Sequence, residues 1–260
     1  MIAAIGHGAL ADRGAVRTIG GSSIASTRAL LMAATITGIS SMATRQVLAE
    51  LAAAYRARTG VAVEIESVGG VDAARRVAAG EPFDVVVLAS DAIAKLEAAG
   101  AVVPGSATPL VRSAVAIAVR AGGPRPDVGS EEALQRAVLA ARTIGYSTGP
   151  SGTALLQLFE RWGVADALRA RAVQAPPGVP VGTLVARGEV ELGFQQSSEL
   201  MGLDGVSVLG TMPPGTEIVT IFTGAVCAAS TQPDAARALL DFMRSSAAAD
   251  AKRRHGMESA

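Results

Sequence analysis

The chain has 260 residues, of which 50% are hydrophobic, 18% are charged and only 3% are aromatic. This composition predicts a globular protein whose cores are built from aliphatic side chains, and it excludes a disordered chain. Because 23 basic residues balance 23 acidic ones, the net charge gives no support for a nucleic-acid or membrane-surface partner. Any preference for anions must therefore be local.

Cysteine and histidine are too scarce for a metal centre or a disulfide. Cys227 is the only cysteine, and it lies in the apolar run AVCAAS. His7 and His255 are the only histidines, and both lie near the ends of the chain. We therefore expect no transition-metal site, no cofactor and no intramolecular disulfide, and we interpret Cys227 as a core residue. No stretch approaches the roughly 20 apolar residues of a membrane span.

Residues 1–32 are predicted to lie outside the fold. They are rich in Gly and Ser and contain scattered arginines, but no long apolar run follows those arginines. The one apolar stretch, 29–39, overlaps the first predicted strand, so cleavage after it would remove that strand. We therefore expect no signal peptide and a cytoplasmic location, with 1–32 as a disordered or non-native extension and Met32 as an alternative start.

The first part of the chain alternates strands with helices. Three short apolar runs predict buried strands, and each is followed by a Ser- or Gly-containing turn and a helical pattern. The strands are expected at 34–39, 61–67 and 83–89, and the helices at 42–59, 71–80 and 91–100. This alternation predicts a parallel sheet with right-handed crossovers.

Ligands in sheets of this kind bind beyond the carboxyl ends of the strands. In the first part of the chain these ends carry small residues that leave room for a ligand, namely Ser40, Ser41, Gly69, Gly70 and Ser90. The sequence therefore predicts a ligand site at this edge of the sheet.

The second part of the chain resumes the strand–turn–helix pattern between two long strands. Strands are expected at 112–121, 143–147, 190–196 and 218–229, and helices at 131–141, 153–163, 183–189 and from Pro233 onward. Ser130 is placed to cap the helix 131–141. The two long strands, 112–121 and 218–229, are interpreted as crossovers between two lobes. We therefore predict a discontinuous domain 1 at 33–112 and 222–260, and a domain 2 at 113–221.

The recurring candidate for a binding site in this sequence is a Ser- or Gly-containing turn before a helix N-terminus, where an anion can bind. The first four N–H groups of a helix lack intrahelical partners, and the macrodipole adds about half a positive charge there. Small residues before the helix let an oxyanion approach, and serine hydroxyls add donors. Each such serine is also an ordinary helix cap, but several such turns at strand ends favour one shared anion site. The candidate turns are Ser40–Ser41, Gly69–Gly70, Ser147 to Gly152 with Ser151, and Gly178–Val179.

Phosphate-binding loops and nucleophile elbows are excluded by their spacing. The run GYSTGPSG lacks the Gly-Lys-Ser/Thr that closes a Walker loop, and no Gly spacing matches a dinucleotide fingerprint. No Gly-x-Ser-x-Gly elbow stands beside a usable histidine. Arg75 and Arg76 are interpreted as a solvated helix face, and Tyr146 as a strand-packing residue.

The run SSMATRQVLAELAAAYRARTG, the Gly turn after it and the helix that leads into AAGEPFDVVVLAS resemble the periplasmic molybdate-binding protein family of type 2 solute-binding proteins. The resemblance runs from about residue 35 to the C-terminal helix. It implies an α/β, type 2 periplasmic-binding-protein fold of two lobes, with mixed, mainly parallel sheets and two crossover strands. It also implies the periplasmic location that is usual for the family, and an ABC permease as partner if the chain is exported.

The family's oxyanion ligands correspond in this sequence to Ser40 or Ser41, Gly69 or Gly70, Ser151 between Ser147 and Gly152, the region of Gly178, and Gln196. Two positions depart from the family. The second turn has glycines where the family has hydroxyls, and Gln196 replaces a tyrosine. Both departures imply a roomier, amide-lined pocket, and they favour an organic di- or tricarboxylate over molybdate.

The strings VVPGS, GYSTGPSG and ARGEVELGFQQSSEL resemble a branch of the family that includes aconitate isomerase, which interconverts cis and trans forms of a tricarboxylate by a 1,3 proton shift. Two hypotheses therefore stay open: a receptor for a small anion, and a cofactor-free isomerase. The isomerase needs a base near the allylic carbon, and Asp91, Tyr146 and Glu199 are the candidates. The lack of a recognisable signal peptide favours the enzyme.

Overall fold

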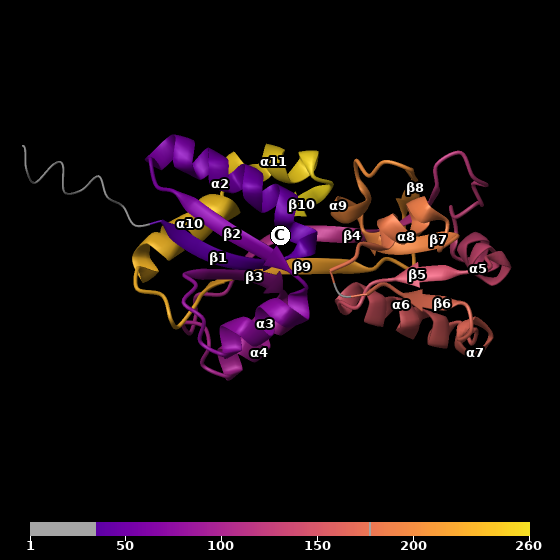
Figure 1. Cartoon of the computed structure of the whole chain (residues 1–260), viewed down its shortest axis with the longest axis horizontal. Helices are drawn as coiled ribbons and strands as arrows, with labels where there is room; N and C mark the ends of the chain where they lie inside the picture. The colour runs from indigo at the N-terminus through magenta and orange to yellow at the C-terminus, as the bar shows by residue number, and fades with distance from the viewer. Residues whose placement is uncertain (1–34, 177) are drawn as a thin grey trace, which may run out of the picture. The chain divides into compact units, whose positions relative to one another are not determined.

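The computed structural model describes residues 35–176 and 178–260, and Thr35–Ala260 form one compact unit. The expected extension 1–32 lies outside the described residues. Within the compact unit, strands and helices alternate along the chain (Figure 1). The first strand of the structure, Ile36–Ser41, thus begins one residue after the start of the described segments.

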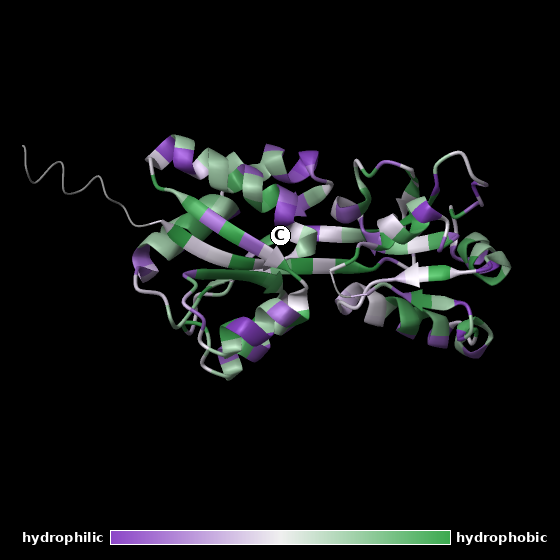
Figure 2. Cartoon of the chain, viewed as in Figure 1, coloured by the Kyte–Doolittle hydropathy of each residue, from purple (hydrophilic) through white to green (hydrophobic). Residues whose placement is uncertain are grey.

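Three strand–helix units form the first part of the chain. Strand β1 (Ile36–Ser41) leads through the 3-10 turn η1 (Met42–Thr44) into α2 (Arg45–Thr59), β2 (Val63–Val68) leads into α3 (Gly70–Ala78), and β3 (Val85–Ala89) leads into α4 (Ser90–Ala98). Hydrophobic residues run the length of β3 (Figure 2), and all five are buried. Helix α2 ends at Gly60, whose φ of 77° favours glycine.

The second part of the chain begins with the long strand β4 (Thr108–Arg120). Ser130 caps α5 as predicted, because its hydroxyl accepts a hydrogen bond from the Ala133 N–H at 3.2 Å. The elements that follow β4 are α5 (Glu131–Ala140), β5 (Ile144–Tyr146), α6 (Pro150–Arg161), α7 (Ala165–Leu168), β6 (Ala172–Gln174), α8 (Val181–Arg187), β7 (Leu192–Gln196), α9 (Ser197–Leu200), β8 (Val206–Thr211), β9 (Val219–Val226), α10 (Pro233–Arg244), η2 (Ser246–Ala248), α11 (Ala249–Arg254) and β10 (Met257–Ser259).

The strands lie side by side in the order β2-β1-β3-β9-β4-β7-β5-β6, and β8 and β10 also pair with β4. The pairs β1–β2, β1–β3, β5–β6 and β5–β7 are parallel, whereas every pairing of β4 or β9 is antiparallel. Strand β4 pairs with β9 over 108–114 and with β7 and β8 over 115–120. Strands β4 and β9 are therefore the crossover strands between two lobes, which confirms the expected fold class.

Each lobe has its own apolar cores. In the first lobe, α2 and α10 pack on one face of the sheet and α3 and α4 on the other (Figure 1), around Leu48 and Leu239 and around Val77 and Ile93 respectively. In the second lobe, α5 and α6 pack over β5 and β7 around Phe159. Helices α8 and α9 cover the opposite face. The helices thus cover the faces of the sheet, and the turns that precede the helices lie at the carboxyl ends of the parallel strands.

The predicted elements are largely confirmed, and the differences concern short segments. Strands β6, β8 and β10 and helices α7 and α11 were not predicted, because they are three to six residues long and carry few fully buried apolar residues. Ser40 and Ser41 lie inside β1 rather than after it, since they pair with Ser67 and Val68 of β2. The domain boundaries at 33–112, 113–221 and 222–260 stay a prediction.

Candidate anion-binding site

Ser40 and Ser41 point to opposite faces of the sheet at the carboxyl end of β1. The fully buried Ser40 hydroxyl lies 2.8 Å from the Ser67 hydroxyl, on the face that α2 covers. The Ser41 Cβ lies on the α3 face, 3.7 Å from the position that a Cβ of Gly70 would take. The Ser41 hydroxyl is buried and has no hydrogen-bond partner among the described residues. A buried hydroxyl without a partner is costly unless something binds it, so the geometry favours Ser41 as the ligand.

Gly69 and Gly70 open α3 with backbone angles that other residues also adopt. Gly69 has a φ of −58°, so no left-handed conformation calls for glycine there. A Cβ at Gly69 would meet no other atom of the described chain within 4 Å. A Cβ at Gly70 would make only ordinary contacts, with Ser41 and with Leu88 at 3.9 Å. The two glycines therefore leave room where a hydroxymethyl group would fit.

The turn from Ser147 to Gly152 brings two predicted residues together at the N-terminus of α6. The Ser147 and Ser151 hydroxyls lie 3.0 Å apart. Gly152 makes this possible, because a Cβ there would lie 1.9 Å from the Ser147 carbonyl oxygen. Pro150 occupies the first turn, where its missing N–H costs nothing. Ser151 is buried and Ser147 is half-buried, so this pair forms a small hydroxyl cluster at a helix N-terminus.

Gln196 ends β7 and reaches the crossover strand β9. Its Nε2 donates to the Thr220 hydroxyl at 2.7 Å, while its buried Oε1 has no hydrogen-bond partner in the part of the chain that the structure describes. Ser113, the cross-strand neighbour of Thr220, also has a buried hydroxyl without a partner in the described ranges. Sequence reasoning missed Ser113 and Thr220, although a hydroxyl within each long apolar strand was a usable signal.

Gly178 lies in the turn between β6 and α8. Its φ of 78° is left-handed, which favours glycine. The N–H of Val179 donates to the Pro176 carbonyl at 3.0 Å, so this amide is already engaged within the turn. In the structure described, the Val179 N–H is therefore not free to act as the backbone donor that the family resemblance implies for this region.

Strand β9 is the element that both lobes share near these residues. Ser90, the first residue of α4, donates to the Ile221 carbonyl at 3.1 Å, and its hydroxyl lies 2.7 Å from that of Thr223. Helix α6 also contacts β9. In addition, the Ser198 hydroxyl of α9 donates to the Ala43 carbonyl of η1 at 2.9 Å. Ser90 of the first lobe and helix α6 of the second thus contact the same crossover strand, whereas the convergence of Ser41, Ser151 and Gln196 on one ligand stays a prediction.

The three candidate bases have different surroundings. Asp91 is exposed in the first turn of α4, with its carboxylate 4.0 Å from Lys95 Nζ. Tyr146 ends β5 half-buried. The half-buried Glu199 accepts a hydrogen bond from Gln195 Nε2 at 2.9 Å. Burial raises the pKa of Glu199 to about 7, although the bond from Gln195 acts to lower it. A carboxyl group with a pKa of about 7 suits proton transfer near neutral pH.

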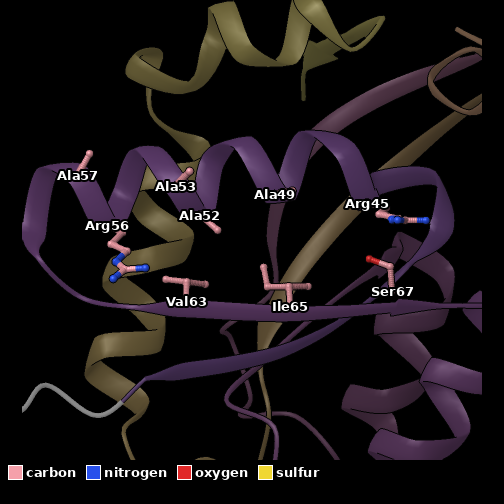
Figure 3. A pocket seen from close by; sticks show the side chains of 9 residues that line it. All are labelled: Arg45, Ala49, Ala52, Ala53, Arg56, Ala57, Val63, Ile65 and Ser67. Carbon is pink, nitrogen blue, oxygen red and sulfur yellow. The ribbon is translucent and has the colours of Figure 1, made fainter. Parts of the chain in front are cut away.

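A hollow lies on the α2 face of the first lobe. A groove of about 710 Å³ runs between α2 and β2, with Arg45 and Ser67 at one end and Arg56 and Val63 at the other (Figure 3). Ala49 and Ala53 of α2 line it between the two arginines. A second hollow, of about 570 Å³, lies between the loops 125–129 and 209–214. Ser41, Ser151 and Gln196 line neither hollow, so their assignment rests on strand ends and unpartnered atoms.

The described residues contain no helix with enough apolar length to cross a membrane. Across 35–176 and 178–260, no three His, Cys, Asp or Glu side chains gather as metal ligands would. Cys227 is buried, as predicted, and burial together with the nearby Asp84 charge raises the pKa of its thiol to about 12.

Residues 36–258 match the sequence model of a family described as bacterial extracellular solute-binding proteins. A protein named aconitate isomerase from a Pseudomonas species is 38% identical over 230 residues, which span 86% of this chain and 87% of that protein. The family match thus extends over both lobes and includes the strand ends described above.

Solved structures of anion-binding proteins share the fold. The periplasmic molybdate-binding protein of Azotobacter vinelandii superimposes with a TM-score of 0.71 and 21% identity, over 85% of this chain and 98% of that one. The sulfate-binding protein of Mycobacterium tuberculosis gives a TM-score of 0.71 and 20% identity, over 86% of each chain. At these identities the likeness is one of fold.

Proposed function

Because the chain belongs to the bacterial extracellular solute-binding proteins, we propose that it binds a small organic anion, a di- or tricarboxylate, at the carboxyl ends of the parallel strands. The Ser41 hydroxyl carries this proposal, since it is buried without a partner among the described residues and lies beside the N-terminus of α3. An ionised carboxylate would supply the missing acceptor, and the α3 N–H groups would add donors. The hydroxyls of Ser147 and Ser151 would serve a second carboxylate.

The space around the strand ends supports a carboxylate over a compact oxyanion. A tetrahedral oxyanion needs donors packed closely around it, but Gly69 and Gly70 leave room and contribute only backbone N–H groups. The Gln196 amide can donate to a carboxylate and accept from a hydroxyl, which suits a larger polar ligand. Its Nε2 already donates to Thr220, whereas its buried Oε1 has no partner in the structure described.

A thermal-shift panel tests this proposal. Di- and tricarboxylates such as succinate and trans-aconitate should raise the melting temperature of the full chain, because a ligand that binds only the folded state stabilises it. Sulfate, molybdate and tungstate at equal concentration should raise it less. A larger shift with molybdate than with every carboxylate would contradict the choice of ligand class.

Isomerase activity is the second candidate, and the 38% identity to a protein named aconitate isomerase favours it. In the reaction a base takes a proton from the methylene carbon beside the double bond. The electron pair of that C–H bond forms a new double bond, the old one opens toward the far carbon, and that carbon accepts a proton. No oxidant or further reactant is needed. N–H donors at helix N-termini would stabilise the negative charge that develops on the carboxylate.

Turnover is measured by following dissolved trans-aconitate by NMR for conversion to the cis isomer. If the chain is an isomerase, one of the variants Glu199→Gln, Asp91→Asn and Tyr146→Phe should lower kcat at least about a hundredfold, as expected for loss of a general base. The other two variants serve as matched controls. Tight binding of trans-aconitate without any conversion would leave the receptor function alone.

The family's description as extracellular proteins supports a location outside the cytoplasm. It gives no support to the cytoplasmic location expected from the sequence. A receptor in that location would deliver its ligand to an ABC permease, whereas an isomerase would need no such partner. Cell fractionation followed by sequencing of the mature N-terminus tests the location directly.

A further inference from the structure

Two hydrocarbon side chains stand exposed on the crossover strand β9. Val219 and Ile221 are each 42% exposed, while Thr220 and Phe222 between and beside them are buried. Successive residues of a strand face opposite sides, so Val219 and Ile221 share one face of the sheet. Large aliphatic side chains that are exposed next to each other on one strand indicate a surface that binds a ligand or a partner.

The exposed face of β9 is the one on which the Ser41 side chain lies. Thr223 shares this face with Ile221, and its hydroxyl meets that of Ser90 at 2.7 Å. Leu88 is the cross-strand partner of Thr223, and its Cδ2 lies 3.9 Å from the position of a Cβ at Gly70. Gly70 in turn adjoins Ser41. Ile221, Thr223, Leu88 and Ser41 therefore lie on the face of the sheet at which α3 begins.

A third exposed aliphatic residue flanks this region. Val71 directly follows Gly70 in the first turn of α3 and is 73% exposed. Among the described residues the other large exposed hydrophobic side chains are Leu139, Leu156 and Met201, which belong to helices α5 and α6 and to the turn after α9. Exposed aliphatic side chains thus lie next to hydroxyl and N–H donors at the carboxyl edge of the first lobe.

We propose that Val219 and Ile221 form an apolar floor that contacts the hydrocarbon backbone of the ligand, while Ser41 and the α3 N-terminus hold a carboxylate. This inference rests on the proposed function and narrows it. The ligand class is a polycarboxylate whose charged groups are joined by a hydrocarbon segment. An inorganic oxyanion has no such segment, so its affinity is independent of the floor.

The size of the effect follows from the area that the ligand would cover. At about 25 cal/mol per Å² of apolar surface, covering the exposed part of one isoleucine favours binding by about tenfold, and a threonine in its place retains part of that contact. We therefore expect Ile221→Thr to weaken trans-aconitate binding about fivefold. Val219→Thr should weaken it by a similar or smaller factor. Both substitutions keep a β-branched residue, so the strand is preserved.

Titration calorimetry of the full chain with trans-aconitate and with sulfate tests the floor. Wild type, Ile221→Thr, Val219→Thr and the control Leu139→Gln are compared, since Leu139 is 41% exposed on α5 and thus similar to Ile221 in exposure. The floor variants should lose trans-aconitate affinity and show a less negative heat-capacity change of binding, because less apolar surface is buried. Sulfate affinity and the Leu139→Gln control should stay at wild-type values.

Two failures are distinguishable. If the wild-type chain binds no carboxylate, the proposed function and the floor are both refuted. If it binds trans-aconitate but both floor variants match Leu139→Gln in affinity and heat capacity, only the floor is refuted. An equal loss of sulfate affinity would also refute it, because sulfate has no hydrocarbon to contact the floor.

Discussion

Buried polar side chains stand at both ends of the parallel strands in the first lobe, but only one end is saturated with hydrogen bonds. At the amino end, the buried carboxylate of Asp84 accepts from the Thr37 N–H at 2.9 Å, the Thr37 hydroxyl at 3.1 Å, Ser230 Oγ at 2.7 Å and Gln232 Nε2 at 2.9 Å. At the carboxyl end, the Ser41 hydroxyl has no partner within 35–176 and 178–260.

This difference separates polar groups that hold the fold from polar groups that await a ligand. Burial acts to raise the pKa of Asp84, but the hydrogen bonds from Thr37, Ser230 and Gln232 together bring it below its ordinary value. A carboxylate with all its donors in place stabilises the fold and has nothing to offer a ligand. Burial alone does not distinguish the two roles, whereas the completeness of the hydrogen bonds does.

The largest effect on stability is expected at the saturated end. Asp84→Ala leaves several buried donors without an acceptor, so we expect the free energy of unfolding to fall by about 3 kcal/mol, measured by urea denaturation. The surface control Asp166→Ala breaks only an exposed ion pair with Arg169, so it should change stability by less than about 0.5 kcal/mol. Ligand affinity of the folded fraction should survive both changes. An Asp84→Ala protein that kept its stability but lost its ligand affinity would contradict the assignment of Asp84 to the fold.

At the unsaturated end the expected effect falls on binding. Ser41→Ala removes a charge-assisted hydrogen bond to the ligand, so trans-aconitate affinity should fall about ten- to a hundredfold by calorimetry. The unfolding free energy should change by less than about 0.5 kcal/mol, because no hydrogen bond of the free protein is lost in the described part of the chain. The neighbour Ser40 gives the opposite expectation. Ser40→Ala breaks the bond to Ser67, so it should cost about 1 kcal/mol of stability and leave affinity unchanged.

Glu199 is an intermediate case, since one hydrogen bond only partly compensates its burial. Its pKa rises from the ordinary 4.5 to about 7 in the folded chain, so the folded state favours the protonated form. The stability contributed by this group is therefore complete below about pH 4.5 and is lost as the pH rises through 7. Thermal melts across this range should show that Glu199→Gln reduces the decline. A decline of equal size in the variant would assign it to other groups.

The smallest effect is expected from filling the open space. Gly70→Ser adds a hydroxyl where a Cβ meets only ordinary contacts, so stability should change by less than about 1 kcal/mol. The added donor should improve sulfate binding a few-fold relative to trans-aconitate, measured as a ratio of dissociation constants. An unchanged ratio would mean that the space beside Gly70 is not where the anion binds.

The alternation of strand and helix was readable because it depends on local patterns. The runs around β1, β2 and β3, the stop at Gly60 and the Ser130 cap all follow from residue types at short spacing. The crossover strands were recognisable from their length. Strand β8 was not predicted, because all its residues are half-buried or exposed and therefore show no clear alternation of apolar and polar positions. It pairs with the later part of β4.

For the candidate site, the sequence predicted which turns contribute but not which side chain of each turn is available to a ligand. Sequence alone could not separate Ser40 from Ser41, because the choice depends on which face of β1 each side chain takes and on the partner that Ser67 supplies across the sheet. The bond between Gln196 and Thr220 was equally hidden, since it joins strands that are neighbours of β4 rather than of each other. Long-range pairing, which no local pattern records, decides which hydroxyls remain available.

A crystal structure of the full chain with trans-aconitate tests the central claim most directly. We expect a carboxylate oxygen about 2.7 Å from the Ser41 hydroxyl, with the carbon chain against Ile221 and Val219. We also expect that the Ser40 hydroxyl still binds Ser67. Two observations together would contradict this expectation. The ligand density would lie in the groove between Arg45 and Arg56 (Figure 3), and the Ser41 hydroxyl, which has no partner among the residues described here, would remain without one.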